Sequence, residues 1–552
     1  MGFRDAEVSL AAVGFETVWL QRLEGSTLGF RPSQAAEIPI SALHPNAAPG
    51  GSSRMLKKGF PALFPGTCPC AATINQMLAH LICVRGNDLR RVLDMNTTQT
   101  LVIGAGISGL STAFFLRQQG HAVTVLEAAG RAGGHVHTFW HEGFMLEAGP
   151  NTLLDNDPAI AQLIDGLNLR ADVCEANPAA KRRYVVRDGR AIQLPGSPMS
   201  FLASPLFSPA GKLRLLAEPF IGRATQEESV AELVRRRLGQ EFLDWAIDPF
   251  VSGVYAGDPA RLSVRAATSK VYALEHEHGS LIRGALSKAF RARKAHVQTM
   301  PLGHMFSFSR GLGQLIDALT HALGASLHLN TAAQGLQHTR EGWLVHTSHG
   351  TFAAQNVILA LPAEACASLL EPFLGVRVQT LRDIPYPPVM SVALGFRRED
   401  VAHALDGFGV LIPAKERVTT LGALFSSTLF AGRAPEGQVL LTAFIGGRRH
   451  EDIGAWTEEA VAARVLADLA PILGLRAAPL MRHVQRWPRA IPQYELGHLE
   501  RIASLDDDMH RLEGLVTRAN WRDGVSVSDA MRNGCALAKR LHNSSAQLSD
   551  FD

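Results

Sequence analysis

Three glycines near residue 105 have the spacing that binds the phosphates of a dinucleotide. Gly104, Gly106 and Gly109 follow the apolar stretch 100–103 and precede an apolar-periodic stretch that ends at Gly120. In a strand–turn–helix unit the first glycine permits a tight turn, the second lets the backbone approach a pyrophosphate, and the third lets the helix pack on the strand. The anion then lies at the positive end of the helix dipole. The spacing therefore predicts a nucleotide-binding unit.

An acidic residue closes this unit. A second predicted strand, residues 122–126, ends at Glu127, 23 residues beyond the first glycine. An acid at this position can accept hydrogen bonds from the adenosine ribose. Because strand, glycines, helix, second strand and acid all agree, a purely structural explanation of the glycines is disfavoured. The remaining residues of the predicted phosphate loop are Ala105, Ile107 and Ser108.

Two further glycine stretches decide which dinucleotide is expected. One follows Glu127 closely and the other comes after a hairpin-like stretch. An NAD-binding domain needs neither of them. The pair resembles the extended FAD fingerprint of the glutathione-reductase-like amine oxidase and desaturase superfamily. The resemblance implies FAD as the cofactor, with contacts from Arg131, Gly134, His135, Gly149, Pro150, Asn151 and Thr152.

The C-terminal region should complete the flavin site. Residues 515–517 predict a strand, 519–524 a loop and 525–541 a helix. In the superfamily that the sequence resembles, this helix directs its N-terminus at the flavin pyrimidine edge, where the helix dipole favours negative charge on the reduced ring. Taken without the resemblance, a glycine before a helix is ordinary capping. The resemblance implies backbone contacts from Val525, Ser526 and Val527, and one from Ala333 on the adenine side.

Longer stretches narrow the family further. They are DPFVSGVYAGDP at 248–259, FSFSRGLG at 306–313, GFGVLIP at 407–413, LFSS at 424–427 and GVSV at 524–527. Together they resemble the oxygen-dependent protoporphyrinogen IX oxidase family of flavoenzymes. The resemblance implies that protoporphyrinogen IX is oxidised to protoporphyrin IX while three O2 become H2O2. Because FAD supplies the hydride chemistry, no catalytic side chain is expected.

The family's substrate is a tetrapyrrole with propionates, so its site needs a cation at one edge. Residues 181–189, KRRYVVRDG, predict a β-hairpin whose first strand carries the charges into an Asp-Gly turn. The resemblance implies that Arg183, which precedes Tyr184, binds a propionate through two hydrogen bonds. Arg182 is the neighbouring candidate, but strand alternation points it to the opposite face. Alone, such a charge run is usually a solvated surface.

The same substrate needs apolar walls. The resemblance implies that Phe408 stacks on the ring system and that Val389 lies in an upstream apolar wall. Without the surrounding motifs both residues would be assigned to the core of a strand.

Two other functions stay open. One is coproporphyrinogen III oxidation on the same fold and flavin, because one basic strand does not indicate how many propionates the substrate carries. The other is a non-catalytic binding protein on the scaffold of the Rab GDP-dissociation inhibitors, against which the glycine loop, Glu127 and the C-terminal motif argue. His135, His137 and His141 lie close together but lack an acidic or cysteine partner pattern, so no metal site is expected.

The composition limits cellular context and partners. Lys and Arg total 54 against 51 for Asp and Glu, a balance that does not indicate a nucleic-acid surface, and no nucleic-acid partner is expected. Six cysteines without a disulfide or zinc pattern fit a reducing cytoplasm. Acidic residues near the N-terminus argue against a signal peptide, and no stretch reaches the length of a membrane span. Peripheral contact with the inner face of a membrane and homodimerisation are the remaining partner expectations.

The fold class expected is α/β. It consists of a Rossmann-like FAD domain of the glutathione-reductase and amine-oxidase type, a mainly β substrate domain and a helical insertion. The chain has 552 residues, enough for roughly three to four domain-sized units. The expected leader and tail are 1–94 and 544–552, and Met95 would be the true start. The FAD domain is expected over 95–178, 304–365 and 505–543, the substrate domain over 179–195 and 366–504, and the helical insertion over 196–303.

Overall fold

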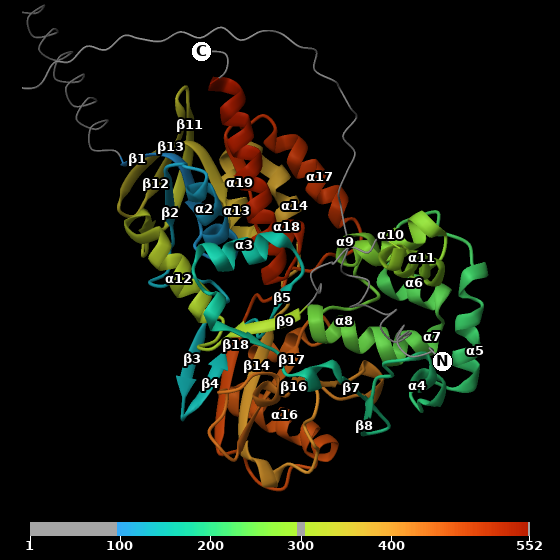
Figure 1. Ribbon diagram of the computed structural model, residues 1–552. Helices are drawn as coiled ribbons and strands as arrows, with labels where there is room; N and C mark the ends of the chain where they lie inside the picture. Colours follow the sequence, from blue (N-terminus) through green and yellow to red (C-terminus); the bar gives the residue numbers. More distant parts are fainter. Residues whose placement is uncertain (1–95, 295–303, 550–552) are drawn as a thin grey trace, which may run out of the picture. The chain divides into compact units, whose positions relative to one another are not determined.

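The structure is a computed structural model that describes residues 96–294 and 304–549. Its first sheet, seven-stranded among these residues, has the order β10-β2-β1-β13-β12-β11, with β19 also paired to β13. Figure 1 labels β1, β2, β11, β12 and β13 of this sheet. The strands β10, β2, β1, β13 and β19 run parallel, and the β11–β13 meander is antiparallel. The strand bounds are β1 Asn96–Ile103, β2 Val123–Leu126, β10 Leu327–His328, β11 Ala333–Thr339, β12 Gly342–Thr347, β13 Gly350–Leu359 and β19 Leu515–Thr517.

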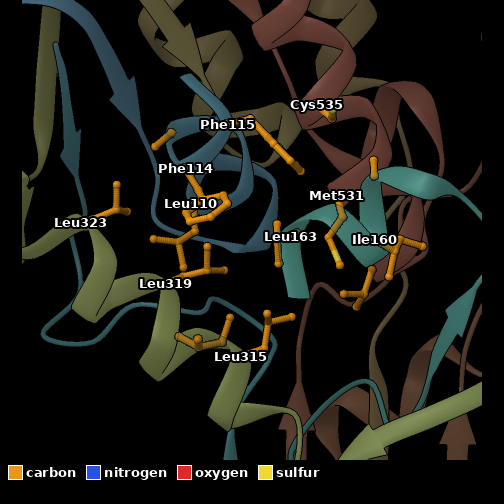
Figure 2. Close-up of a cluster of buried hydrophobic side chains, with 14 of the residues drawn as sticks. Leu110, Phe114, Phe115, Ile160, Leu163, Leu315, Leu319, Leu323, Met531 and Cys535 are labelled. Carbon is orange, nitrogen blue, oxygen red and sulfur yellow. The ribbon is translucent and has the colours of Figure 1, made fainter. Parts of the chain in front are cut away.

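Both faces of this sheet are covered, as a parallel sheet requires. Val102 belongs to a core cluster with four helices on one face, while its neighbours Leu101 and Ile103 belong to a cluster on the other face. Figure 2 shows the first cluster, to which α2, α3, α12 and α19 each contribute apolar side chains. The bounds of these helices are α2 Ile107–Gln118, α3 Pro158–Gly166, α12 Gly313–Leu323 and α19 Val527–Ser549. On the other face the helices include α13 Ala363–Leu374, α14 Gln379–Arg382, α17 His498–Met509 and α18 Asn520–Asp523.

A second sheet, also seven-stranded in the described part of the chain, has the order β18-β14-β17-β16-β15-β7-β8. It is antiparallel except where β15 pairs with β7. One face packs on α16, Glu458–Leu473, through a continuous apolar core. The strand bounds are β7 Tyr184–Arg187, β8 Arg190–Gln193, β14 Val389–Arg397, β15 Gly409–Leu411, β16 Thr420–Leu424, β17 Gln438–Gly446 and β18 Met481–Trp487. The short helix α15, Ser426–Leu429, follows β16.

Two smaller sheets are formed by segments that lie, along the chain, between strands of the two large sheets. A hairpin is formed by β3 Thr138–His141 and β4 Phe144–Glu147, and β5 Leu153–Asp155 and β6 Val173–Glu175 both pair with β9 His304–Phe308.

The segment after residue 196 is helical. Its apolar side chains form a cluster of their own, which also includes Val185 and Leu411 from the second sheet. Among the described residues, no helix combines the length and apolar character needed to cross a bilayer. The helix bounds are α4 Pro198–Ala203, α5 Pro209–Leu216, α6 Val230–Arg237, α7 Gln240–Phe242, α8 Asp248–Tyr255, α9 Val264–Ala267, α10 Ser269–His278 and α11 Leu281–Lys294, with a π-helix, η4, over Leu243–Ile247.

The α/β architecture with a parallel nucleotide-type sheet, a second β-rich part and a helical insertion agrees with the expected fold class. The expected leader, 1–94, and the last residues of the tail, 550–552, lie outside the described residues. The boundaries between the discontinuous domain segments stay predictions.

Candidate functional site

The glycine loop lies at the carboxyl end of β1, where ligands of parallel sheets bind. Gly104 has φ +104°, and a Cβ there would lie 2.5 Å from the carbonyl oxygen of Ala360. A Cβ on Gly109 would lie 1.9 Å from the oxygen of Gly104, so this residue must be glycine for α2 to pack. A Cβ on Gly106 would meet nothing within 4 Å. The folded protein therefore requires Gly104 and Gly109, whereas Gly106 borders open space.

That open space adjoins a free helix N-terminus. Gly106 is the N-cap of the 12-residue helix α2, and no side chain caps its first amides. Ile107 is half-buried, while Ala105 and Ser108 are buried below it. Uncapped amides at a helix N-terminus bind anions. The loop thus fits the pyrophosphate of a dinucleotide.

Glu127 is held against the glycine loop. One carboxylate oxygen accepts a hydrogen bond from the Ala105 amide at 2.8 Å, and the other accepts one from the Ala129 amide at 2.9 Å. The Glu127 carbonyl also accepts from the Thr331 amide at 2.7 Å, two residues before Ala333 begins β11. The structure therefore brings Glu127 to the loop, and the chain that leads to Ala333 passes beside it.

The second and third glycine stretches touch the first. The Gly133 amide donates to the Ala105 carbonyl at 2.8 Å, and a Cβ on Gly134 would lie 3.4 Å from the Cα of Gly106. A Cβ on Gly149 would lie 2.3 Å from the carbonyl oxygen of His135. Arg131, Gly134 and His135 are exposed, and Gly149, Pro150, Asn151 and Thr152 are half-buried. All three stretches therefore line one open region at the N-terminus of α2.

The C-terminal segment that is expected to contact the flavin differs in local structure from the prediction. The predicted loop 519–524 contains the short helix α18, and α19 begins at Val527 and extends to Ser549 instead of spanning 525–541. Gly524, with φ +122°, separates the two helices, and the Ser526 hydroxyl accepts from the Asp529 amide at 3.0 Å. Val525 and Ser526 therefore precede the helix, while Val527 is its first residue.

The helices α2 and α19 run side by side in the same direction. The Ser111 hydroxyl donates to the Ala530 carbonyl at 3.4 Å, and near the other ends His121 and His542 have ring centroids 5.6 Å apart. Both N-termini consequently lie at the same end of the pair. Two positive helix ends on one side fit a ligand that carries a pyrophosphate at one point and an electron-accepting ring at another.

Tyr494 holds the turn that leads into α19. Its hydroxyl accepts from the Gly524 amide at 2.8 Å and donates to the Asn520 carbonyl. Its ring stacks on the buried ring of His498 at 4.2 Å and 12°. Burial raises the pKa of Tyr494, and burial together with Arg501 lowers the pKa of His498 to about 4. Sequence reasoning missed both residues, since nothing in their spacing marks them.

The buried imidazole of His498 predicts a pH dependence of stability. Below its usual pKa of 6.5 the unfolded chain binds a proton that the folded protein accepts only near pH 4. Stability should therefore fall by up to about 3 kcal/mol between pH 6.5 and pH 4. Urea unfolding of His498→Gln should lose this slope, whereas His349→Gln, at an exposed position, should keep it. Equal pH slopes in both variants would contradict the prediction.

A buried ion pair joins the segments expected to bind FAD (95–178, 304–365 and 505–543, the flavin segments) to the connection that leads from α15 into β17. Arg433 donates to Glu147 at 2.8 Å, and their side chains are 3% and 4% exposed. Arg433 also donates to the Ser307 hydroxyl, while Glu147 accepts from Thr138 and from the Leu312 amide. Sequence reasoning missed Arg433, because the two partners are 286 residues apart.

The predicted hairpin is present, and its basic residues take separate directions. The first strand begins at Tyr184, after both arginines, and the turn occupies Asp188 and Gly189, both with positive φ. Arg182 pairs with Asp406, which also accepts from the Tyr184 hydroxyl at 2.6 Å. Arg183 instead lies 5.2 Å from the centroid of the Phe408 ring. Arg182 is therefore tied to the side of Tyr184, and Arg183 faces the other side.

Strand register identifies a wall on the face that Arg183 shares. Val389 is opposite Trp487 on β18, and Phe444 lies opposite both Ser391 and Gly422. Val389, Phe444 and Trp487 belong to one apolar cluster, whereas Phe408 and Leu424 belong to another. The half-buried large side chains on this face include Leu411, Leu424, Phe444 and Trp487. These four residues are further candidates for the wall. No sequence motif indicates them, although strand alternation predicts that they lie on one face of the sheet.

The two ends of this wall differ in chemistry. At one end the Trp487 indole donates to the Ala148 carbonyl at 2.7 Å, and its ring lies 4.5 Å from that of His135. At the other end, across the strands β14 to β15, lies Arg183. The wall therefore connects the flavin segments to a cation.

The DPFVSGVYAGDP stretch fixes the helical segment to this sheet. Arg449 pairs with Asp248 at 2.5 Å and with Asp258 at 3.1 Å, so it joins both ends of the motif. A Cβ on Gly253 would lie 2.4 Å from a Leu411 methyl group. The motif thus places α8 against the wall.

Known proteins share this organisation. The family described as flavin containing amine oxidoreductase matches residues 107–542. Protoporphyrinogen oxidase 2 of Arabidopsis thaliana is 33% identical over 472 residues, which cover 79% of this chain and 92% of the relative. Coproporphyrinogen III oxidase of Bacillus subtilis is 27% identical over 455 residues, 79% of this chain and 96% of the relative.

A crystal structure of a protein from Exiguobacterium sp. has the same fold. It superimposes with a TM-score of 0.69 at 21% identity and covers 82% of this chain and 100% of its own. The open region at Gly106 and the two parallel helix N-termini fit the FAD that this family uses. The chain is therefore an oxidoreductase of the flavin containing amine oxidoreductase family, and within it belongs with the protoporphyrinogen oxidases.

Proposed function

We propose that this enzyme oxidises protoporphyrinogen IX to protoporphyrin IX and passes the electrons to three O2, which become three H2O2. The observation that carries the proposal is the wall between the flavin segments and Arg183. A porphyrinogen is an apolar tetrapyrrole that carries carboxylates at its edge, so it fits a surface with hydrophobic side chains in the middle and a guanidinium at one end.

When FAD is bound, its flavin ring is the acceptor for hydride from the saturated bridges of the substrate. The protein's own task is to place the substrate. Arg183 binds a propionate by charge-assisted hydrogen bonds, and Phe408 beside it covers the apolar ring edge. Val389, Phe444 and Trp487 form the apolar surface nearest the flavin segments. This arrangement orients the ring system and excludes water from it.

Coproporphyrinogen III is the alternative substrate, and relatives that carry its name are less similar to this chain. Arg182 pairs with Asp406 on the side of Tyr184, whereas Arg183 lies beside Phe408 at the end of the wall. Steady-state oxidation of both porphyrinogens by the flavin-loaded enzyme tests the proposal: kcat/KM should be higher for protoporphyrinogen IX, and turnover confined to coproporphyrinogen III would overturn it.

We further propose that the enzyme rests on the cytoplasmic face of a membrane. Five large apolar side chains are 62–84% exposed on α4, α5 and the following turn, and Lys212 on α5 donates to the carbonyls of Leu202 and Ser204 at the end of α4. Exposed apolar side chains on adjacent short helices suit the interfacial region of a lipid bilayer. The five side chains are Met199, Leu202, Leu213, Leu216 and Phe220.

Vesicle binding tests this membrane proposal. The double variant Leu216→Ser with Phe220→Ser should bind phospholipid vesicles at least about tenfold more weakly, because each buried side chain contributes about 1.5–3 kcal/mol. Val376→Ser is the control, since Val376 is 90% exposed outside the patch. Co-sedimentation that is unchanged in the double variant would show that this patch does not contact lipid.

A further inference from the structure

Arg518 lies at the carboxyl end of the parallel sheet, directly after β19. Its amide donates to the Leu359 carbonyl at 2.9 Å, which extends the pairing of β19 with β13. Leu515 and Ala519 pack in the cluster on one face, and Val516 packs against the cluster of α2 and α19 on the other. By strand alternation Arg518 shares the face of Val516. Its side chain therefore belongs to the side on which the two helix N-termini lie.

The guanidinium of Arg518 is buried and incompletely bonded. The residue is 6% exposed and its outer nitrogen pairs with Asp523, but its Nε has no hydrogen-bond partner. A buried N–H without a partner costs about 1–3 kcal/mol. Burial, and to a smaller extent the positive charge of Arg522, lowers the pKa of Arg518 to about 10. Arg518 therefore stays a cation at neutral pH.

The loop around Arg518 borders the glycine loop. The Trp521 indole donates to the Leu361 carbonyl at 2.9 Å, and a Cβ on Gly104 would lie 3.1 Å from a Leu361 methyl group. The acidic and basic groups that interact with Arg518 are Asp523, Asp529, Arg522 and Arg532, together with the Tyr494 hydroxyl that caps Gly524. An unpaired buried donor thus lies where the glycine loop and the α19 N-terminus meet.

We infer that Arg518 is a further flavin-binding residue, whose Nε donates to an oxygen of FAD and whose fixed charge favours the negative charge that the flavin gains on reduction. The inference rests on the flavin cofactor and is independent of which porphyrinogen is oxidised. A purely structural explanation is that Arg518 braces the turn through Asp523. The two explanations differ in what happens when Asp523, rather than Arg518, loses its charge.

The experiment compares Arg518→Met, Arg518→Lys and Asp523→Asn with Arg522→Met as the control. Arg522 also interacts with Asp523, and it binds Asp506 and the Thr517 hydroxyl, so its loss reproduces the disturbed ion pair. FAD dissociation constants are measured on stripped protein, and flavin midpoint potentials on reconstituted protein. Both readouts are independent of turnover.

Arg518→Met should weaken FAD binding about tenfold and reduce the preference for reduced flavin about tenfold, equivalent to about 30 mV for a two-electron couple. Arg518→Lys should keep the potential and recover part of the affinity. Asp523→Asn should raise the potential, because it leaves the Arg518 charge uncompensated, and Arg522→Met should change neither quantity.

Three results would overturn the inference. Unchanged affinity and potential in Arg518→Met would remove the contact, and loss of affinity with an unchanged potential would remove the electrostatic role. Equal weakening by Arg518→Met and Asp523→Asn, without opposite shifts of potential, would establish the brace. If Arg518→Met does not fold, Arg518→Lys and Asp523→Asn decide by the same criteria. Failure of the wild-type chain to bind FAD would instead refute the cofactor assignment.

Discussion

Gly106→Val should abolish FAD binding and leave the fold of the apoprotein intact. Gly106 has φ −70° and ψ 173°, an extended conformation that valine adopts without strain. A Cβ at this position meets no protein atom within 4 Å, so the side chain would extend into the open region at the N-terminus of α2. The valine would occupy the volume that the pyrophosphate needs. We expect an increase of at least about 100-fold in the FAD dissociation constant, or about 3 kcal/mol.

Thermal unfolding separates this effect from misfolding. The variant should unfold at the temperature of the wild-type apoprotein, and added FAD should raise that temperature for the wild type alone. Gly196→Val is the matched control, because a Cβ on Gly196 also meets nothing within 4 Å but lies in the stretch before α4. Gly109→Val should fail differently, by losing the fold, since its Cβ would overlap the Gly104 carbonyl. Normal FAD affinity in Gly106→Val would place the pyrophosphate elsewhere.

Local chemistry explains what the sequence could predict. The glycine loop was predictable because each glycine answers a local steric demand: the positive φ of Gly104 and the close approach of Gly109 both follow from a strand that turns directly into a helix. The hairpin at Asp188 was predictable for the same reason, since an Asp-Gly pair accepts two residues with positive φ.

Long-range contacts explain what the sequence could not predict. The partner of Glu147 is Arg433, and no local pattern connects the end of β4 to a residue in the connection between α15 and β17. The wall residue Phe444 has the composition of an ordinary strand residue, and only its register opposite Ser391 and Gly422 places it on the face of Val389. The observed start of α19 lies two residues beyond the predicted one, because the Ser526 hydroxyl accepts from the Asp529 amide and caps the helix directly before Val527.

Arg183→Ala should raise the KM for protoporphyrinogen IX by about 10- to 100-fold and leave FAD binding unchanged. The guanidinium lies beside Phe408 at the end of the wall opposite Trp487, so its loss removes the charge-assisted hydrogen bonds to a propionate, each worth about 1.5–3 kcal/mol. The flavin segments do not include this hairpin, and for that reason the flavin absorbance and the FAD dissociation constant should stay at their wild-type values.

Arg182→Ala is the control that the chain itself offers. Arg182 precedes Arg183 and carries the same charge, but it pairs with Asp406 on the side of Tyr184, so its removal should change KM less than about threefold. Arg183→Lys keeps the charge and loses the planar pair of donors, and it should recover only part of the affinity. If Arg182→Ala and Arg183→Ala raise KM equally, the hairpin acts through its net charge; if neither does, the propionate is bound elsewhere on the wall. A large effect of Arg183→Ala alone would show that strand alternation, which separates two adjacent arginines, selects the residue that meets the substrate.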